Sequence, residues 1–229
     1  MLSKIKNLTK RTIRKVKYAG INLMPECQVW FLKYFFEKKQ QKFLINSGDP
    51  VRFGAVLLAI QDIQKNHIKG AFAEAGVYQG FLSKFIHDHA PDRKLYLFDT
   101  FEGFPSQNLK NGPDNRFKDT SIEIIKKRLG NMDNVIIKKG FFPESAKDLK
   151  NQEFAFAMLD FDLYDSILAA LEFFYPRMTN GGYIFLHDYH SPESESGVSR
   201  ATEEFMKDKK EKIVGIPDAC GSVIIRKIC

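Results

Sequence analysis

Two short acidic segments have residue types that could do chemistry. Asp160-Phe161-Asp162 and His187-Asp188-Tyr189 each end an apolar run with the length of a buried strand. The carboxyl ends of neighbouring parallel strands meet at one edge of a sheet, so we expect these side chains to lie close together. Ionised carboxylates in contact repel one another and are stabilised by a cation, a shared proton or a basic partner. An oxygen-rich set favours Mg²⁺ or Mn²⁺, and His187 shifts the preference slightly toward Mn²⁺ or a later transition metal. The alternative is that these acidic residues cap helices or turns and form surface salt bridges.

Earlier strands deliver a different kind of group to the same edge. The segment Glu74-Ala75-Gly76-Val77-Tyr78-Gln79-Gly80 combines an acidic residue, two glycines and the expected start of a helix. Glycines allow a ligand to approach the backbone, and the amides at a helix N-terminus attract a carboxylate or phosphate. Asp99 ends the next strand, where a carboxylate can accept both hydroxyls of a ribose, and Phe141 could lie against an adenine ring. These features predict a nucleoside ligand. The alternatives are that the glycines only form a tight turn, that Asp99 caps a helix or turn, and that Phe141 is a buried core residue.

Taken in order, these motifs resemble the macrocin O-methyltransferase family, the metal-dependent enzymes that methylate sugar hydroxyls of macrolide and aminocoumarin antibiotics. The resemblance covers residues 70–227. It rests on six matches in the right order: Glu74 to Gly80, Phe98 to Pro105, Gly140 to Pro143, Leu159 to Tyr164, Tyr175-Pro176 with Gly181-Gly182-Tyr183, and His187-Asp188-Tyr189. The family members often have Asp-Asp-Tyr where this chain has His187-Asp188-Tyr189.

The resemblance implies that S-adenosylmethionine is the methyl donor. Its implied binding residues come from the first turns and strand ends: Glu74, Gly76, Val77, Tyr78, Gly80, Ser83, Asp99, Thr100, Phe101, Gly140 and Phe141. Within this set, the resemblance assigns Asp99 to the ribose and Phe141 to the adenine.

The resemblance also implies roles for the acidic segments. Asp160 and Asp188 would be ligands of Mg²⁺ or Mn²⁺, and Asp162 the general base, so that Asp160 and Asp162 are the catalytic residues. His187 would be a third metal ligand; alternatively it orients Asp188 or faces the acceptor.

The expected reaction is divalent-metal-dependent transfer of a methyl group from S-adenosylmethionine to a hydroxyl of a sugar or glycoconjugate, which makes the partner a small-molecule or glycan acceptor. Two alternatives stay open: a catechol-type small-molecule O-methyltransferase, and a catalytically silent module that binds S-adenosylmethionine. An NAD-dependent oxidoreductase is disfavoured because the first turn lacks the GxGxxG pattern.

The elements that must position these residues follow an α/β pattern beyond Gly70. Short apolar runs predict seven strands, over residues 71–77, 95–100, 134–139, 154–160, 183–188, 212–216 and 222–227. Amphipathic stretches predict helices over residues 81–89, 122–129, 166–175 and 199–206, and Ser47-Gly48-Asp49-Pro50 predicts a further helix start. The link Pro217 to Gly221 is too short for a crossover helix and predicts one antiparallel strand. We therefore expect a doubly wound, seven-stranded, mostly parallel sheet of the class I methyltransferase type. The polar insertion from Phe104 to Thr120 is expected to act as a lid.

The charge distribution sets the N-terminal segment apart. Residues 1–42 carry 11 Lys or Arg against 2 Asp or Glu, whereas the remaining residues carry 24 against 26. We expect residues 1–46 to form a basic, aromatic-rich helical extension and residues 47–229 to form the methyltransferase domain. A main body that bound nucleic acid would carry the basic excess itself, so nucleic acid is not expected as a partner. The aromatic patch Trp30-Phe31-Leu32 and Tyr34-Phe35-Phe36 predicts either an element that docks on a membrane surface or glycolipid, or a helix packed on the catalytic domain or on a partner subunit. Residues 1–42 thus favour contact with a membrane surface or with a partner protein, and homo-oligomerisation is left open.

The cysteines and apolar runs bear on location. Three cysteines, an odd number and widely spaced, do not form a disulfide framework, and a reducing cytoplasm is expected. The sequence has neither a run long enough to span a membrane nor the apolar region of a signal peptide. We therefore predict a cytoplasmic protein. The basic extension suggests a second possibility, peripheral attachment to the inner membrane surface.

Overall fold

The computed structural model describes residues 36–104, 116–192 and 196–228. The chain divides into two compact units, Met1–Pro50 and Val51–Cys229. In the first unit, helix α3 (Lys38–Asn46) begins where the Glu37 N–H donates to Gln40 Oε1 over 2.9 Å. Residues 1–35 of the predicted basic extension, with most of its aromatic patch, and residues 105–115 in the middle of the predicted lid lie outside the described residues.

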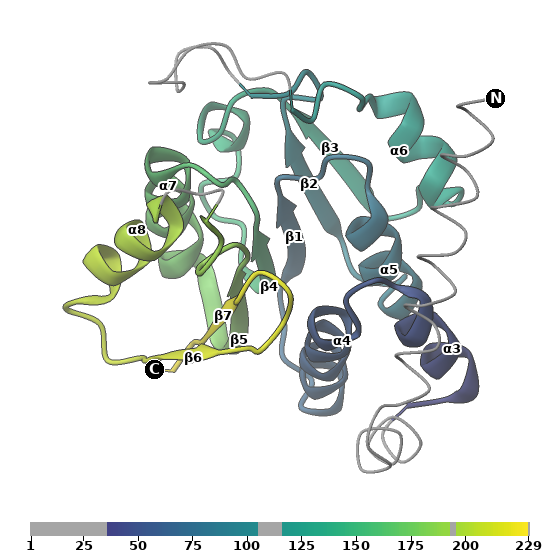
Figure 1. Cartoon of the computed structure of the whole chain (residues 1–229), viewed down its shortest axis with the longest axis horizontal. Coiled ribbons are helices and arrows are strands. Elements are labelled where there is room, and N and C mark those ends of the chain that lie inside the picture. The colour runs from purple at the N-terminus through teal and green to yellow at the C-terminus, as the bar shows by residue number, and fades with distance from the viewer. Residues whose placement is uncertain (1–35, 105–115, 193–195, 229) are drawn as a thin grey trace, which may run out of the picture. The chain divides into compact units, whose positions relative to one another are not determined.

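Seven strands of the second unit form one sheet in the order β3-β2-β1-β4-β5-β7-β6 (Figure 1). They are β1 (Ala71–Ala75), β2 (Leu95–Asp99), β3 (Val135–Lys139), β4 (Phe154–Leu159), β5 (Met178–Leu186), β6 (Ile213–Gly215) and β7 (Val223–Arg226). The first five pair in parallel, and β7 pairs antiparallel with both β5 and β6. The predicted seven-stranded sheet with one antiparallel strand is thus confirmed.

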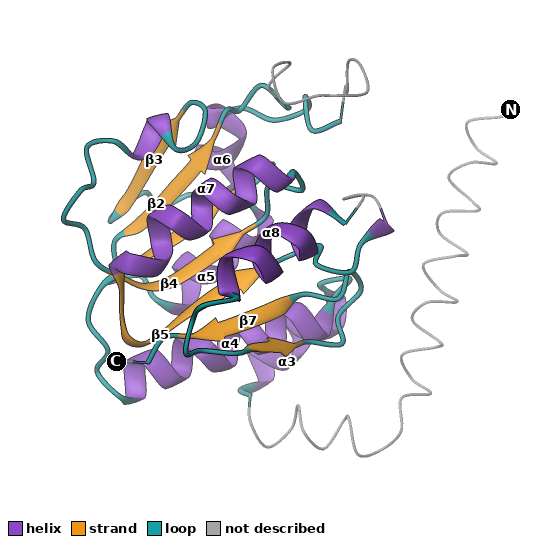
Figure 2. Cartoon of the chain, turned by 90° about the vertical axis from the view of Figure 1, so that its left-hand side faces the viewer, coloured by secondary structure: helices purple, strands orange, loops and turns teal. Residues whose placement is uncertain are grey.

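Helices cover both faces of this sheet. They are α4 (Pro50–Lys65), α5 (Phe81–His89), α6 (Ile122–Leu129), α7 (Tyr164–Phe174) and α8 (Gly197–Met206), with the 3₁₀ turns η2 (Glu144–Ala146) and η3 (Tyr175–Arg177). Helices α7 and α8 lie on one face, and α4, α5 and α6 on the other (Figures 1 and 2). Local signals explain the starts of two of them: Pro50 opens α4, and the Ser121 hydroxyl accepts the Ile124 N–H at the start of α6.

The central strands β1 and β4 are buried along their whole length, as expected for a sheet covered on both faces. Next to them, Phe98, Phe142, Phe154 and Phe174 pack with ring centroids 5.0 to 5.8 Å apart. This aromatic cluster lies in the main core of the sheet. A rigid core of this kind holds the strand ends, and with them the candidate site residues, at defined positions.

Strand β5 differs from its predicted range. It begins at Met178 instead of residue 183, and the β4–β5 register shifts between Phe154 and Phe156. Gly181 has φ of +84°, and a Cβ there would lie 2.8 Å from Ile68 Cδ1. The two glycines interrupt the apolar run, so the sequence pattern recognised only the second half of the strand.

Candidate active site

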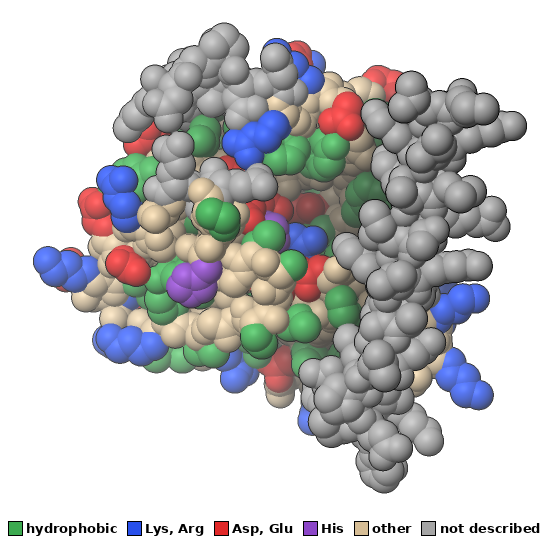
Figure 3. Space-filling view, viewed as in Figure 1, with side chains coloured by type: hydrophobic (Ala, Val, Ile, Leu, Met, Phe, Trp, Pro, Cys, Tyr) green, Lys and Arg blue, Asp and Glu red, His purple; other side chains and the backbone are tan. Residues whose placement is uncertain are grey.

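The carboxyl ends of β1, β2, β4 and β5 lead into a cavity of about 230 Å³. Ten of the fifteen predicted site residues line it: Gly76, Tyr78, Asp99, Thr100, Gly140, Phe141, Asp160, Asp162, His187 and Asp188. The other five, Glu74, Val77, Gly80, Ser83 and Phe101, do not line it. Figure 3 shows acidic side chains gathered in a hollow bordered by hydrophobic ones. The structure therefore brings the two predicted groups, the nucleoside turns and the acidic segments, to one place.

Gly76 brings the first turn against the end of β4. Its φ is +89°, and a Cβ on it would lie 2.0 Å from the backbone oxygen of Asp160. The Asp160 N–H donates to Ala75 O over 2.8 Å, which joins the two strand ends directly. A side chain cannot be accommodated at this position, because both the backbone conformation and the neighbouring carbonyl exclude it.

Asp99 organises the turns around the cavity. Its Oδ2 accepts the N–H groups of Val77 and Tyr78 over 2.7 and 2.9 Å, and its Oδ1 accepts the N–H of Phe101 over 2.7 Å. The alternative role considered for this residue, as a turn cap, is therefore present in the structure. A carboxylate has about four acceptor positions, so these three bonds leave room for a hydroxyl from the cavity. The ribose contact stays a prediction.

Glu74 and Ser83 lie behind the cavity wall. The Ser83 hydroxyl donates to Glu74 Oε2, and Glu74 is 3% exposed. Burial raises the pKa of Glu74 to about 8; the Ser83 hydrogen bond lowers it, and the Asp160 and Asp99 carboxylates raise it further. In this structure Glu74 thus tethers β1 to α5.

The acidic segments converge as predicted. One carboxylate oxygen each from Asp160, Asp162 and Asp188 lie within 4.8 Å of one another. Asp162 and Asp188 both have positive φ, of 60° and 58°, a conformation that is uncommon outside glycine and recurs at functional sites. Such a set of oxygens fits a hard divalent cation.

The electrostatics of this cluster differ from one carboxylate to the next. Burial raises the pKa of Asp162 to about 8, and Asp160 and Asp188 add to the effect, while Arg116 opposes it. Burial alone would also raise the pKa of Asp188, but hydrogen bonding and attraction to His187 hold it well below its usual range. Crowded carboxylates with separated pKa values are a frequent feature of sites that move protons or hold cations.

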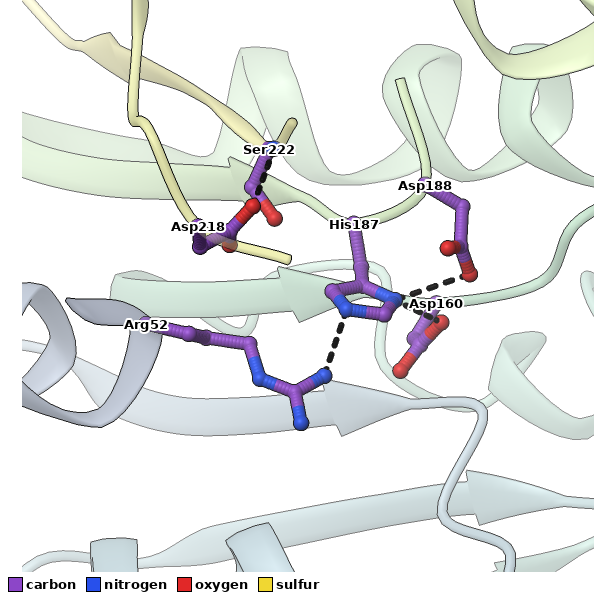
Figure 4. Close-up of polar contacts among 6 residues, drawn as sticks. All are labelled: Arg52, Asp160, His187, Asp188, Asp218 and Ser222. Carbon is purple, nitrogen blue, oxygen red and sulfur yellow. Dashed lines mark hydrogen bonds and ion pairs between the residues drawn. The ribbon is translucent and has the colours of Figure 1, made fainter. Parts of the chain in front are cut away.

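His187 lies between these carboxylates and a residue that the sequence did not single out. Its Nδ1 is 3.0 Å from Asp160 Oδ1 and 2.8 Å from Asp188 Oδ2, and its Nε2 is 2.5 Å from Arg52 Nη1 (Figure 4). Burial lowers the pKa of His187, the Asp160 and Asp188 carboxylates raise it above its ordinary value, and the Arg52 guanidinium opposes the carboxylates. Arg52 comes from the first turn of α4, where no local pattern marks it as a site residue.

Other residues at the site were also missed. Cys220 offers its sulfur within 4.8 Å of ligand atoms of His187 and Asp188, so these three form a second candidate metal group. The cavity also has an aromatic wall that includes Phe104, Phe117, Phe142 and Phe161. Phenylalanines that serve as core and those that line a cavity have the same local sequence pattern, so only their positions in the fold distinguish them.

Tyr78 and the two described ends of the insertion meet at the mouth of the cavity. The ring centroid of Phe117 is 5.1 Å from that of Tyr78 and 5.2 Å from that of Phe104. The Tyr78 hydroxyl donates to Asp119 Oδ1 over 2.8 Å. These contacts hold the ends of the insertion beside the cavity.

Comparison with solved structures shows the same fold in other proteins. The O-methyltransferase NovP matches with a TM-score of 0.65 at 22% identity, over 79% of this chain and 81% of that chain. A calicheamicin methyltransferase matches with a TM-score of 0.62 at 18% identity, over 93% and 91%. The class I methyltransferase fold is therefore confirmed.

Three curated relatives are O-methyltransferases by name. The 8-demethyl-8-(2,3-dimethoxy-alpha-L-rhamnosyl)-tetracenomycin-C 4'-O-methyltransferase of Streptomyces olivaceus is 24% identical over 57% of this chain and 57% of its own length. The demethyldecarbamoylnovobiocin O-methyltransferase of Streptomyces niveus is 26% identical over 57% and 56%. The mycinamicin III 3''-O-methyltransferase of Micromonospora griseorubida is 23% identical over 61% and 63%. The matched regions thus span less than two thirds of each relative.

The family match is broader than these pairwise matches. The sequence model described as macrocin-O-methyltransferase (TylF) matches residues 50–219, most of the chain. That range contains Gly76, Asp99, Asp160, Asp162 and Asp188. The chain belongs to the macrocin O-methyltransferase family.

Proposed function

We propose that this protein transfers a methyl group from S-adenosylmethionine to a hydroxyl of a sugar or of a sugar-linked small molecule, with a divalent cation. The observation that carries the proposal is the shared cavity, in which the three carboxylates lie beside the glycine turns and Asp99. The relatives whose names specify a sugar position or a rhamnosyl group support the acceptor class.

The cavity residues fit the methyl donor. Gly76 and Gly140 line the cavity without side chains, and both have a positive φ, of +89° and +132°, that residues with a side chain rarely adopt. Asp99 would accept a ribose hydroxyl beside its three backbone bonds, and Phe141 would pack against the adenine. Glu74 and Ser83, which do not line the cavity, would support the first turn from behind.

The carboxylates fit Mg²⁺ or Mn²⁺. Asp160 and Asp188 would hold the ion, whose chemistry is to lower the pKa of a bound acceptor hydroxyl by Lewis acidity. The observation in favour is the crowding of three carboxylates. Burial raises the pKa of Asp162, Asp160 and Asp188 raise it further, and a cation would relieve that repulsion.

Asp162 would take the proton of the reacting hydroxyl. It lines the cavity beside Asp160 and Asp188, and its left-handed backbone aims the side chain from the turn after β4. A general base must lie within hydrogen-bond reach of the proton that it removes, and such a base contributes about 10²–10⁴-fold in rate. The Asp162→Asn variant is therefore expected to lose that factor while it still binds the donor.

The experiment is a methyl-transfer assay on purified protein with a panel of nucleotide sugars, glycosides and catechols, followed by detection of S-adenosylhomocysteine. We expect turnover on a glycoside that stops in Asp160→Asn and in the presence of a chelator. Undiminished turnover with chelator would contradict metal dependence, and methylation of catechols alone would favour the catechol alternative. Donor binding by calorimetry without turnover on any acceptor would favour the silent module.

We also propose the division into an extension, residues 1–46, and a catalytic domain, residues 47–229, and a cytoplasmic location. The odd number of cysteines and the free Cys220 support a reducing compartment. Among residues 36–104, 116–192 and 196–228, no helix has the length and apolar character that crossing a bilayer requires. Membrane or partner contact through residues 1–42, and self-association, stay predictions.

A further inference from the structure

The two ring nitrogens of His187 face groups of opposite hydrogen-bonding character. Nδ1 faces the carboxylates of Asp160 and Asp188, at 3.0 and 2.8 Å, whereas Nε2 faces Arg52 Nη1 at 2.5 Å (Figure 4). The residue is 8% exposed. Because little water reaches the ring, its protein neighbours determine which nitrogen donates and which accepts.

The hydrogen-bond roles follow from the chemistry of these neighbours. A guanidinium has N–H donors and no acceptor, and it keeps its charge in proteins, so Arg52 must donate and His187 Nε2 must accept. A neutral imidazole that accepts at Nε2 carries its proton on Nδ1. That N–H then points at two carboxylate oxygens, which accept. The Asp160 and Asp188 carboxylates by themselves favour the imidazolium and raise the pKa of His187. An imidazolium, however, would place two N–H donors against each other 2.5 Å apart, so the contact with Arg52 decides for the neutral ring.

We propose that Arg52 is a positioning residue that fixes His187 as its Nδ1–H tautomer. His187 is then a hydrogen-bond donor that orients the Asp160 and Asp188 carboxylates, and it is not a metal ligand. This inference rests on the proposed function, in which those two carboxylates hold the cation. It predicts a coordination shell of oxygen atoms, which favours hard ions such as Mg²⁺.

The geometry argues against ligation by either nitrogen. The Nε2 lone pair is directed at a guanidinium, whose positive charge would repel a second cation there. Nδ1 carries the proton and therefore has no lone pair to offer. Partners of this kind, which hold ligands in place without touching the ion, typically change metal affinity or activity by about 10–100-fold when removed.

The first test measures the tautomer in metal-free protein. Nitrogen NMR on protein labelled with ¹⁵N-histidine, with His187 assigned from the His187→Gln spectrum, is expected to show an unprotonated Nε2 and a protonated Nδ1. In Arg52→Met the Nε2 signal is expected to move toward the protonated type. Arg226→Met is the matched control, because Arg226 pairs with Asp62 of the same helix over 3.1 Å, and it should leave the signal unchanged. A protonated Nε2 in the unmodified protein, or an unchanged signal in Arg52→Met, would overturn the proposal.

The second test asks whether His187 touches the ion. Pulsed electron paramagnetic resonance of the Mn²⁺-loaded protein should show no coupling to a histidine nitrogen. A coupling that disappears in His187→Gln would refute this inference, even if sugar methylation had been established. Conversely, absence of methyl transfer together with the expected NMR pattern would refute the proposed function and leave the Arg52–His187 arrangement intact.

Kinetics separate positioning from general stability. Arg52→Met is expected to lower kcat by about 10–100-fold with little change in KM for the acceptor, and Arg52→Lys, which keeps a charged donor, should recover part of the loss. Circular dichroism checks that each variant is folded. An equal loss in Arg226→Met, or no recovery in Arg52→Lys beyond Arg52→Met, would contradict the positioning role.

Discussion

Glu74 provides a stability prediction that can be worked from the structure. Burial raises its pKa from 4.5 to about 8, so the folded protein binds a proton at Glu74 that the unfolded chain releases at lower pH. The contribution of this group is therefore fully present below pH 4.5 and is lost as the pH rises toward about 8. The difference between the folded and unfolded pKa values of Glu74 corresponds to about 5 kcal/mol of unfolding free energy in total. About 3 kcal/mol of this stabilisation is lost by pH 7.

The perturbation is Glu74→Gln, which does not titrate and still offers an oxygen to the Ser83 hydroxyl. We expect the free energy of unfolding of the variant to fall less steeply with pH than that of the unmodified protein. The gap between the two curves should change by about 3 kcal/mol from pH 4.5 to pH 7. Because all other groups are shared, this difference isolates residue 74.

The assay is urea unfolding followed by circular dichroism at a series of pH values, in protein free of metal and donor. Glu172→Gln, which removes a carboxylate exposed on α7, is the control and should run parallel to the unmodified protein. If the unfolding free energies of Glu74→Gln and of the unmodified protein ran parallel over the same pH range, the reasoning would be refuted. Glu74 would then have the same pKa in the folded protein as in the unfolded chain.

Three further predictions concern the scaffold and the site. Gly76→Ala should destabilise the fold by at least about 2 kcal/mol and weaken donor binding in calorimetry, since its Cβ would lie 2.0 Å from Asp160 O. Gly130→Ala is the control: Gly130 also has a positive φ, but a Cβ there would meet open space, so donor binding should be kept. Phe174→Ala should cost about 3–5 kcal/mol in denaturant unfolding, because its ring is fully buried in the aromatic cluster, and a cost below about 1 kcal/mol would contradict that packing. Glu211→Gln should cost about 1.5–3 kcal/mol near neutral pH through loss of its bond to Lys227. Burial raises the pKa of Glu211, but hydrogen bonds from Lys227 and Tyr175 lower it to about 2 overall, so the stability difference should shrink as the pH falls from 4.5 toward 2, and a constant difference would argue against it.

Much of the fold could be predicted because its signals are local. Helices α5 and α6 match their predicted ranges, since apolar periodicity marks both, Gly80 precedes α5, and Ser121 and Gly130 flank α6. The strand ends that carry Asp160 and Asp188 were found because acidic residues interrupt fully apolar runs. The start of β5 was missed because Gly181 and Gly182 break the pattern of that strand.

The sequence by itself determined which side chains reach the edge of the sheet, because the crossovers between the first five strands make them parallel and place their carboxyl ends on one side. The tertiary structure alone decided what those side chains touch. Arg52 and His187 are 135 residues apart, and Asp99 binds amides more than 20 residues away. Such contacts depend on how α4 and the turns pack on the sheet, and packing is a property of the whole core that local periodicity does not encode.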